Sequence, residues 1–377
     1  MSCNTCDENW LVESCDLDTG LVRNVLQPLD MRFDIGLNQF TDGALTLATR
    51  DIALREVWPG LTSIYISRVA GPGASRSDPV CEFAGIVTDF AMSESGTTVL
   101  GMKSIDWYLT RRNIRIQAEY TNVQQTDLAA RLVNLTSSVY AGKGGIPLVG
   151  DWAPSEYRRD RVYDYWRRKN IGEAIQDLTQ VINGPDWELV HVRAADNTWL
   201  TRMLFRDYVG TDRGVLIRSD VEASAYSVSG DIENMANLVD AYGAGEDEDQ
   251  LRELARNLYS IYPEFDATPV WNDVKLRSTL FDHAQGYLVA NQEPAIVPTV
   301  TVPGLDVDPT ELRVGDTIST DISYGGIRFA GQARVITIAW ELGPESPETR
   351  TLELTPLDPA SESMLLQQPL PVDCEDC

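Results

Sequence analysis

Apolar and polar side chains alternate along the first hundred residues, which is the period of a β-strand with one buried face. Turn signals rich in Gly, Pro, Asp and Ser separate the alternating runs, as at 41–43 and 93–96. Several short strands at this spacing are typical of a barrel or sandwich. Strands are predicted at 31–40, 43–52, 61–69, 82–92 and 97–106.

The hydrophobic period changes to that of a helix near residue 120. Leu128, Leu132 and Leu135 form one helical stripe. Asn170, followed by Glu173 three places on, resembles a capping box at the start of a second helix. The elements predicted in this middle third are helices at 126–135 and 170–182 and strands at 187–193 and 201–209, an α/β arrangement.

The last third begins with two predicted helices and ends in strands. Four acidic residues open the stretch 246–262, where negative charge suits the dipole of a helix N-terminus, and leucines follow at helical spacing until Pro263. A further helix is predicted at 274–290. Beyond Pro294 the alternating pattern predicts β structure again, and the prolines from Pro356 onward predict an extended tail.

One stretch of the β pattern occurs twice. Residues 61–69 lead to Phe-Ala-Gly at 83–85, and residues 316–323 lead to Phe-Ala-Gly at 329–331. In both copies an acidic turn and a closing strand follow. The first copy has a longer loop before the triplet, and surface loops accept such insertions readily. We interpret the repeat as a duplicated β module, the alternative being a chance likeness of two β-hairpins.

The charge balance narrows the functional classes. Acidic residues number 57 against 31 basic ones, a net charge of −26, which is unsuited to binding nucleic-acid phosphates over a broad surface. The two histidines, His191 and His283, leave little material for proton transfer near neutral pH and are predicted to be structural. Lys143 lacks both the preceding Gly and the following Ser or Thr that a phosphate-binding P-loop requires.

One segment is basic in spite of the overall charge. Residues 157–169 place six basic residues among three tyrosines and a tryptophan. Interleaved arginine and aromatic side chains can stack on single-stranded nucleic acid, but they are also enriched in the cores of protein interfaces. Because the chain is acidic, we favour docking onto an acidic neighbouring subunit. The candidate interface residues are Arg158, Arg159, Arg161, Tyr163, Tyr165, Trp166, Arg167 and Arg168.

Two Cys-x-x-Cys pairs stand at the two ends of the sequence. This spacing offers two thiolates to one metal ion, and two such pairs complete a tetrahedral site. Closing so long a loop costs about 5 kcal/mol, against roughly 10–16 kcal/mol released by structural zinc in finger peptides. A disulfide formed after lysis and the absence of any role are the alternatives, and Cys15 and Cys81 are predicted to be small buried hydrophobes. The candidate metal ligands are Cys3, Cys6, Cys374 and Cys377.

Several stretches together resemble a known family. Residues 19–47, 82–112, 237–250 and the block 315–338 are similar to minor tail proteins of siphoviruses that infect actinobacteria. The shared pattern has a fixed order. A first strand is followed by Leu-Asn and then Gly, and a second strand is followed by Phe-Ala-Gly-Ile-Val. A last strand then leads into Asp, Tyr-Leu and Arg. The resemblance implies the central hub of a tail tip, related to the baseplate hub of contractile tails. It implies two similar β-barrels per chain, inserted α/β elements and a trimeric, pseudo-sixfold ring; the cysteine pairs depart from the pattern.

The resemblance also implies partners and a location. The expected partners are copies of the chain, the distal tail protein, the tape-measure protein and a fibre or tip protein, in a virion assembled in the host cytoplasm. DNA is expected to pass an acidic lumen that repels its phosphates, and an iron–sulfur cluster becomes an option beside zinc at the cysteine pairs. No catalytic activity is expected. A cell-wall hydrolase and a carbohydrate-binding protein, which the nine tryptophans could serve, are the competing hypotheses.

Taken together, the patterns predict a mainly β protein with α/β insertions and two similar β-barrel hub domains. Neither a secretory signal nor a membrane span is expected, because the sequence starts without a basic or apolar leader and no run approaches 18 apolar residues. The predicted domains are a first barrel at 1–117, an α/β domain at 118–230, a second barrel at 231–358 with a helical insertion at about 246–291, and an extended tail at 359–377.

Overall fold

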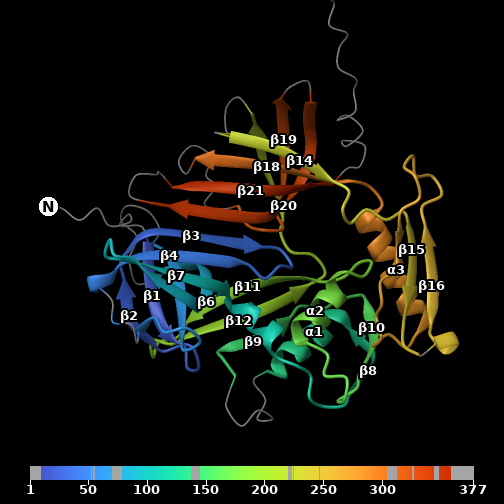
Figure 1. The fold of residues 1–377 in the computed structure, drawn as a ribbon, viewed down its shortest axis with the longest axis horizontal. Helices are drawn as coiled ribbons and strands as arrows, with labels where there is room; N and C mark the ends of the chain where they lie inside the picture. Colours follow the sequence, from blue (N-terminus) through green and yellow to red (C-terminus); the bar gives the residue numbers. More distant parts are fainter. Residues whose placement is uncertain are drawn as a thin grey trace, which may run out of the picture.

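The computed structural model shows a mainly β chain organised in four units (Figure 1). We call them the first β unit (β1–β7), the middle unit (β8–β12 with two helices), the α3 unit (β15–β17 with one helix) and the second β unit (β13, β14 and β18–β21). The structure describes residues 10–357 apart from 52, 54–55, 70–78, 137–144, 220–222, 224, 246, 304–311, 325–326 and 344–347.

The first β unit confirms the strands predicted from the alternating pattern. In β7, for example, Thr98, Leu100 and Met102 are buried on one face, while the residues between them are more exposed. Two 3₁₀ turns, at Thr49–Asp51 and Ile105–Arg111, follow β4 and β7. The strands are β1 (Trp10–Asp16), β2 (Val22–Leu26), β3 (Pro28–Gly36), β4 (Asp42–Ala48), β5 (Thr62–Arg68), β6 (Val80–Met92) and β7 (Thr97–Ser104).

The middle unit confirms both predicted helices and both predicted strands. The side chain of Asn170 accepts a hydrogen bond from the backbone N–H of Glu173 at 3.2 Å, so the predicted N-cap starts the second helix. The elements are β8 (Ala118–Gln124), α1 (Gln125–Asn134), β9 (Leu148–Trp152), β10 (Arg158–Tyr163), α2 (Ile171–Thr179), β11 (Asp186–Arg193) and β12 (Trp199–Arg206). β10 pairs with β8, and β11, β12 and β9 form a second small sheet against which α1 packs.

The α3 unit contains the one predicted helix that is wrong. The stretch 246–262 forms no α-helix in its described residues: a short 3₁₀ turn at Asp247–Asp249 leads into β16 (Arg252–Arg256), which pairs antiparallel with β15 (Leu238–Tyr242). The leucines at helical spacing do not form a buried stripe, since Leu254 is 55% and Leu258 74% exposed. Ala255 faces the core instead.

The second helix predicted in this region is confirmed as α3 (Arg277–Asn291), which packs against β15 and β16. The remaining strand of the unit, β17 (Asp266–Ala267), pairs parallel with β15. Among the described helices, none combines the length and the apolar character that crossing a bilayer requires.

The second β unit begins earlier in the sequence than predicted. β13 and β14, which the sequence analysis assigned to an α/β domain at 118–230, pair with β19 and β18 of this unit instead. The α3 unit is then inserted between β14 and β18. The strands are β13 (Asp212–Arg218), β14 (Ala225–Asp231), β18 (Ala295–Pro303), β19 (Thr317–Tyr324), β20 (Ile327–Leu342) and β21 (Thr349–Pro356).

The two β units repeat one pairing order. Six strands run β3-β4-β7-β6-β5-β1 in the first unit and β14-β18-β21-β20-β19-β13 in the second. Both long central strands carry a bulge at the same place, between Val87 and Asp89 in β6 and between Val335 and Thr337 in β20. The duplication is therefore present in the strand pairing. The copies differ at one end, where β1 pairs antiparallel with β5 but β13 pairs parallel with β19.

The bulges correct the alignment on which the duplication was first inferred. They make Ile86 of β6 the counterpart of Arg334 of β20, because each pairs with the start of the preceding strand just before the bulge. The Phe-Ala-Gly triplets at 83–85 and 329–331 are therefore two residues out of step. A shift of two positions leaves each side chain on the same face of its strand, which explains why the two patterns look alike.

All thirteen strands of the two β units belong to one sheet. The link between the units is the antiparallel pairing of β20 with β3. Two barrels were expected from the sequence. In the described part of the chain the strand pairings form an open path from which β19 and β13 branch at β20, and no pairing closes either unit into a barrel.

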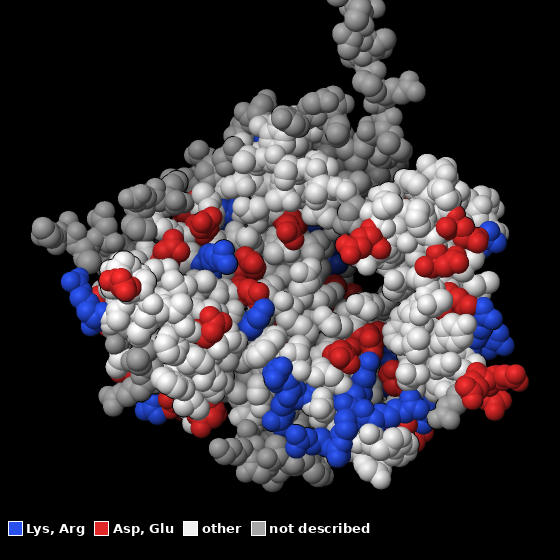
Figure 2. Space-filling view, viewed as in Figure 1, with Lys and Arg blue, Asp and Glu red and all other residues white. Residues whose placement is uncertain are grey.

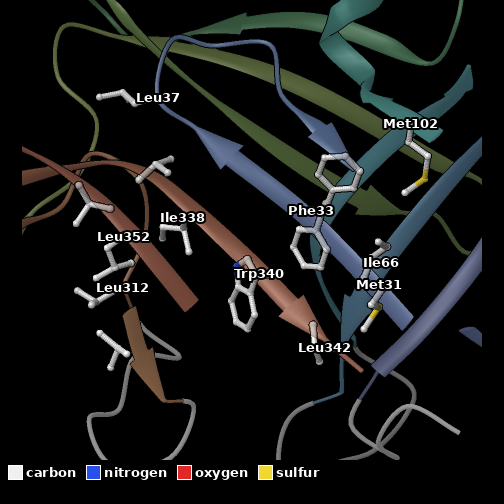
Figure 3. Close-up of a cluster of buried hydrophobic side chains, with 14 of the residues drawn as sticks. Met31, Phe33, Leu37, Ile66, Met102, Leu312, Ile338, Trp340, Leu342 and Leu352 are labelled. Carbon is white, nitrogen blue, oxygen red and sulfur yellow. The ribbon is translucent and has the colours of Figure 1, made fainter. Parts of the chain in front are cut away.

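The core of the two β units is continuous across this link. Trp340 of β20 lies opposite Phe33 of β3, and their rings stack at 5.8 Å with an interplanar angle of 19°. Figure 3 shows Trp340 and Ile338 on β20 beside Phe33 of the first unit. The guanidinium of Arg350 covers the indole of Trp340 at 3.8 Å. The two units therefore bury apolar surface against each other and not only within themselves.

We expect Trp340→Ala to destabilise both β units together. Removing a buried tryptophan from a packed core costs about 3–5 kcal/mol, and the free energy of unfolding in urea should fall by that amount. Leu254→Ala is the matched control, because Leu254 is largely exposed and its loss should change the free energy by less than about 0.5 kcal/mol. Equal effects of the two substitutions would show that the link does not contribute a shared core.

Candidate assembly interface

The basic segment predicted as an interface is divided between the interior and the surface. Strand β10 places alternate side chains on opposite faces, and it buries Arg159, Arg161 and Tyr163. Arg158 lies on the exposed face of the same strand. Three of the eight candidate residues are therefore inside the chain and are not available to a neighbouring subunit.

The two buried arginines bind the α3 unit. Arg159 donates to Asp282 Oδ2 at 2.9 Å and to the carbonyl oxygen of Ile182 at 2.8 Å, and Arg161 donates to His283 Nε2 at 2.9 Å. Asp282 and His283 both lie on α3. An acidic partner was expected on a second subunit, but the acidic partner of Arg159 is Asp282 of the same chain. This contact holds the middle unit and the α3 unit together.

His283 is the most constrained titratable group of this contact. A guanidinium can only donate, so His283 Nε2 must accept and the ring proton resides on Nδ1. The imidazole is fully buried and stacks on Trp271 at 4.6 Å. Burial, reinforced by the charges of Arg161, Arg159 and Lys169, lowers the pKa of His283 well below its ordinary value. The histidine is therefore neutral in the folded protein, in the structural role predicted for it.

The remaining candidate residues stay at the surface. Tyr165 and Trp166 are exposed and pack edge to face with their rings 5.2 Å apart. Arg167 donates to the carbonyl oxygen of Asn272 at 2.8 Å and Arg158 to that of Asn122 at 2.8 Å, so both guanidinium groups are held in place. In Figure 2 Lys and Arg gather on the lower part of the molecule, where the middle unit lies. Exposed arginines of this unit are Arg131, Arg158, Arg167, Arg168, Arg202 and Arg206.

A buried ion pair that the sequence analysis missed joins three units. Asp186, at the start of β11, accepts hydrogen bonds from Asn38 Nδ2 at 2.8 Å and from the backbone N–H of Val209 at 3.0 Å. It also accepts from Arg334 of β20, whose guanidinium lies over the ring of Tyr208 at 4.0 Å. No sequence motif marks this pair, because its members are distant along the chain and each is an isolated charge in a strand.

Two strand edges were also missed by the sequence analysis. Within the described residues, the C-terminal half of β6, residues 88–92, pairs on one side only, with β7. The stretch 227–230 of β14 likewise pairs only with β18. Apolar side chains are exposed on both edges, Met92 on the first and Val228 on the second. Unpaired strand edges are sites where another chain can add a strand.

The four cysteines predicted as metal ligands, Cys3, Cys6, Cys374 and Cys377, lie outside the described residues, so the metal site stays a prediction. Across the part of the chain that is described, no three potential ligand side chains come together as a metal site. Cys15 is buried, as predicted, and burial raises the pKa of its thiol to about 12. Cys81 is partly buried, and both are free thiols.

Known structures share this fold. The tail protein from Neisseria meningitidis MC58 matches 92% of this chain and 96% of its own with a TM-score of 0.59 at 13% identity. The 43 kDa tail protein of prophage MuSo2 from Shewanella oneidensis matches 95% and 100% with a TM-score of 0.59 at 9% identity. Prophage tail protein gp18 from Listeria monocytogenes EGD-e matches 95% and 98% with a TM-score of 0.50 at 13% identity.

Comparisons with protein-family models and with curated proteins found no match. The structural likenesses show that the chain has a fold found in phage tail proteins, as the resemblance seen in the sequence implied. The finer expectation, a siphovirus of actinobacteria, stays a prediction.

The neutral state of His283 has a measurable consequence. An unfolded chain protonates this histidine below about pH 6.5, whereas the folded protein does not. The unfolded state then binds more protons, so the free energy of unfolding falls with decreasing pH by up to about 1.4 kcal/mol per pH unit. We expect His283→Gln to lose this contribution and to show a shallower slope between pH 6.5 and 5 in urea unfolding. A slope identical to that of the parent protein would contradict the neutral assignment.

Proposed function

We propose that this chain is a structural hub protein at the tail tip of a long-tailed bacteriophage and that three copies form a ring. The observation that carries the proposal is the repeated six-strand pairing order within one chain. It occurs in a fold that tail proteins share over more than nine-tenths of their length. In this role the protein has no catalytic activity.

The duplication suits a ring that must match two symmetries. Contacts between unlike surfaces close into a ring when the rotation between units is right. Three chains with two β units each supply six similar units around one axis. Such a ring can join a sixfold tail tube on one side to a threefold tip on the other. The distal tail protein is the proposed partner above, with the tape-measure protein and a fibre or tip protein as the other partners.

Charge supports passage of DNA without binding. One chain carries a net charge of −26, and a ring of three carries three times as much. Like charges repel the phosphates, so DNA slides through such a ring rather than being held by it. The exposed Tyr165, Trp166 and arginines of the middle unit form a local basic, aromatic surface, which we assign to contact with an acidic partner protein of the tail.

The proposed trimer can be tested directly. We expect the purified protein at high concentration to have three times the mass of one chain in light scattering, and antibody-labelled virions to carry the label at the tail tip. A single copy or a sixfold set per virion would contradict the trimer. Release of soluble fragments from purified cell wall would instead favour the hydrolase hypothesis.

The cysteine pairs give an independent test. If Cys3, Cys6, Cys374 and Cys377 hold one zinc ion or an iron–sulfur cluster, elemental analysis of the assembled protein should find the metal in stoichiometric amount. Replacing Cys3 and Cys377 by Ser should remove it, whereas Cys15→Ser should not, because Cys15 lies within β1. No metal above background in the parent protein would leave the pairs to the disulfide or no-role alternatives.

A further inference from the structure

The pairing that links the two β units within one chain has an equivalent pair of strand edges elsewhere in the described part of the chain, and these two edges are not paired with each other. In the link, the second half of β20 pairs antiparallel with β3, and Trp340 lies opposite Phe33. The strand equivalent to β20 in the other β unit is β6, and the strand equivalent to β3 is β14. In the described part of the chain, neither 88–92 of β6 nor 227–230 of β14 has a strand on its second side.

The bulges and registers define which positions correspond. Phe90 pairs with Leu100 as Ile338 pairs with Leu352, which makes Met92 the counterpart of Trp340. On the other side, β14 lies on β18 as β3 lies on β4, which makes Val228 the counterpart of Phe33. The same pairing between chains therefore places Met92 opposite Val228 and Phe90 opposite Gly230.

We propose that the C-terminal half of β6 in one chain pairs antiparallel with β14 of a second copy, and that this contact closes the ring. The inference rests on the proposed trimer and names its contact surface. Links within a chain, β20 with β3, then alternate with links between chains, β6 with β14, around six β units. The two surfaces are unlike, so the contact is head-to-tail, and it closes as a ring when the rotation from one chain to the next is right.

The side chains at these two edges suit pairing with a strand of a second copy of the chain. Met92 is 45% and Val228 38% exposed, and Trp58, also exposed, packs against Phe90 at 5.9 Å. Natural edge strands that remain unpaired are usually protected by charges or proline, whereas residues 225–230 contain neither. An added strand covers both edges with backbone hydrogen bonds and buries the apolar side chains.

The contact between chains is weaker than the link within a chain. Met92 and Val228 occupy the places of Trp340 and Phe33, whose aromatic rings stack. Assembly of the ring should therefore depend on protein concentration, whereas the fold of a single chain does not.

Paired cysteines test the register. In the full-length protein, Met92→Cys together with Val228→Cys places two thiols directly opposite each other across the contact, about 4.5–5.5 Å apart at Cβ. Mild oxidation or a short thiol cross-linker should give covalent dimers and trimers on a non-reducing gel. Each single substitution, and Ala91→Cys with Val228→Cys, should give far less, because Ala91 points to the other face of β6.

A charge on the edge tests the affinity. Val228→Arg should raise the dissociation constant of the trimer at least tenfold, while Val192→Arg on β11, where the side chain is equally exposed at 38%, should leave it unchanged. Circular dichroism shows whether each variant is folded. A trimer that forms no cross-link and tolerates Val228→Arg would overturn the strand pairing and leave the proposed function intact. A protein that stays monomeric at the highest attainable concentration would overturn both.

Discussion

The antiparallel pairing of β20 with β3 is the contact on which the rest of the molecule depends. β20 is long enough to serve two neighbours, since its first half pairs with β19 and its second half with β3. The stacked rings of Phe33 and Trp340 turn this pairing into a shared core. Separated from each other, the two β units would be small sheets that bury a smaller fraction of their apolar surface.

Arginine makes two further contacts between units. Arg334 holds β20 to Asp186 of the middle unit, and Arg159 holds β10 to Asp282 of the α3 unit. A planar guanidinium donates to several acceptors at once, so one side chain fixes both the distance and the angle between two elements. Because removing water from such a pair offsets most of its attraction, its main effect is on placement. The scarcity of lysine, four residues in the whole chain, agrees with this use.

The sequence allowed local elements to be predicted wherever one periodicity dominates, as in β3–β7 and in the three α-helices. It failed at 246–262, where leucines at helical spacing coincide with a strand whose pairing with β15 decides the structure. For the candidate interface, the residue types of the basic segment were visible but their burial was not, because Arg159 and Arg161 are covered by a helix more than a hundred residues away. The strand edges become recognisable only when the two bulges are aligned, and sequence letters alone placed that alignment two residues out of step.

The link within a chain, β20 with β3, has larger side chains than the proposed link between chains, β6 with β14. Because of this difference, we expect a chain to fold before it assembles. Trp340 and Phe33 are buried within one chain and need no second copy to be stable. Met92 and Val228 are exposed in the single chain, and their smaller area holds two chains together only when the chains are concentrated. In the proposed ring, a chain therefore completes its own fold first, and its long central strand β20 is by then paired with strands of the same chain. The edge of β14 at residues 225–230, which contain no charged residue, is then left for one specific neighbour.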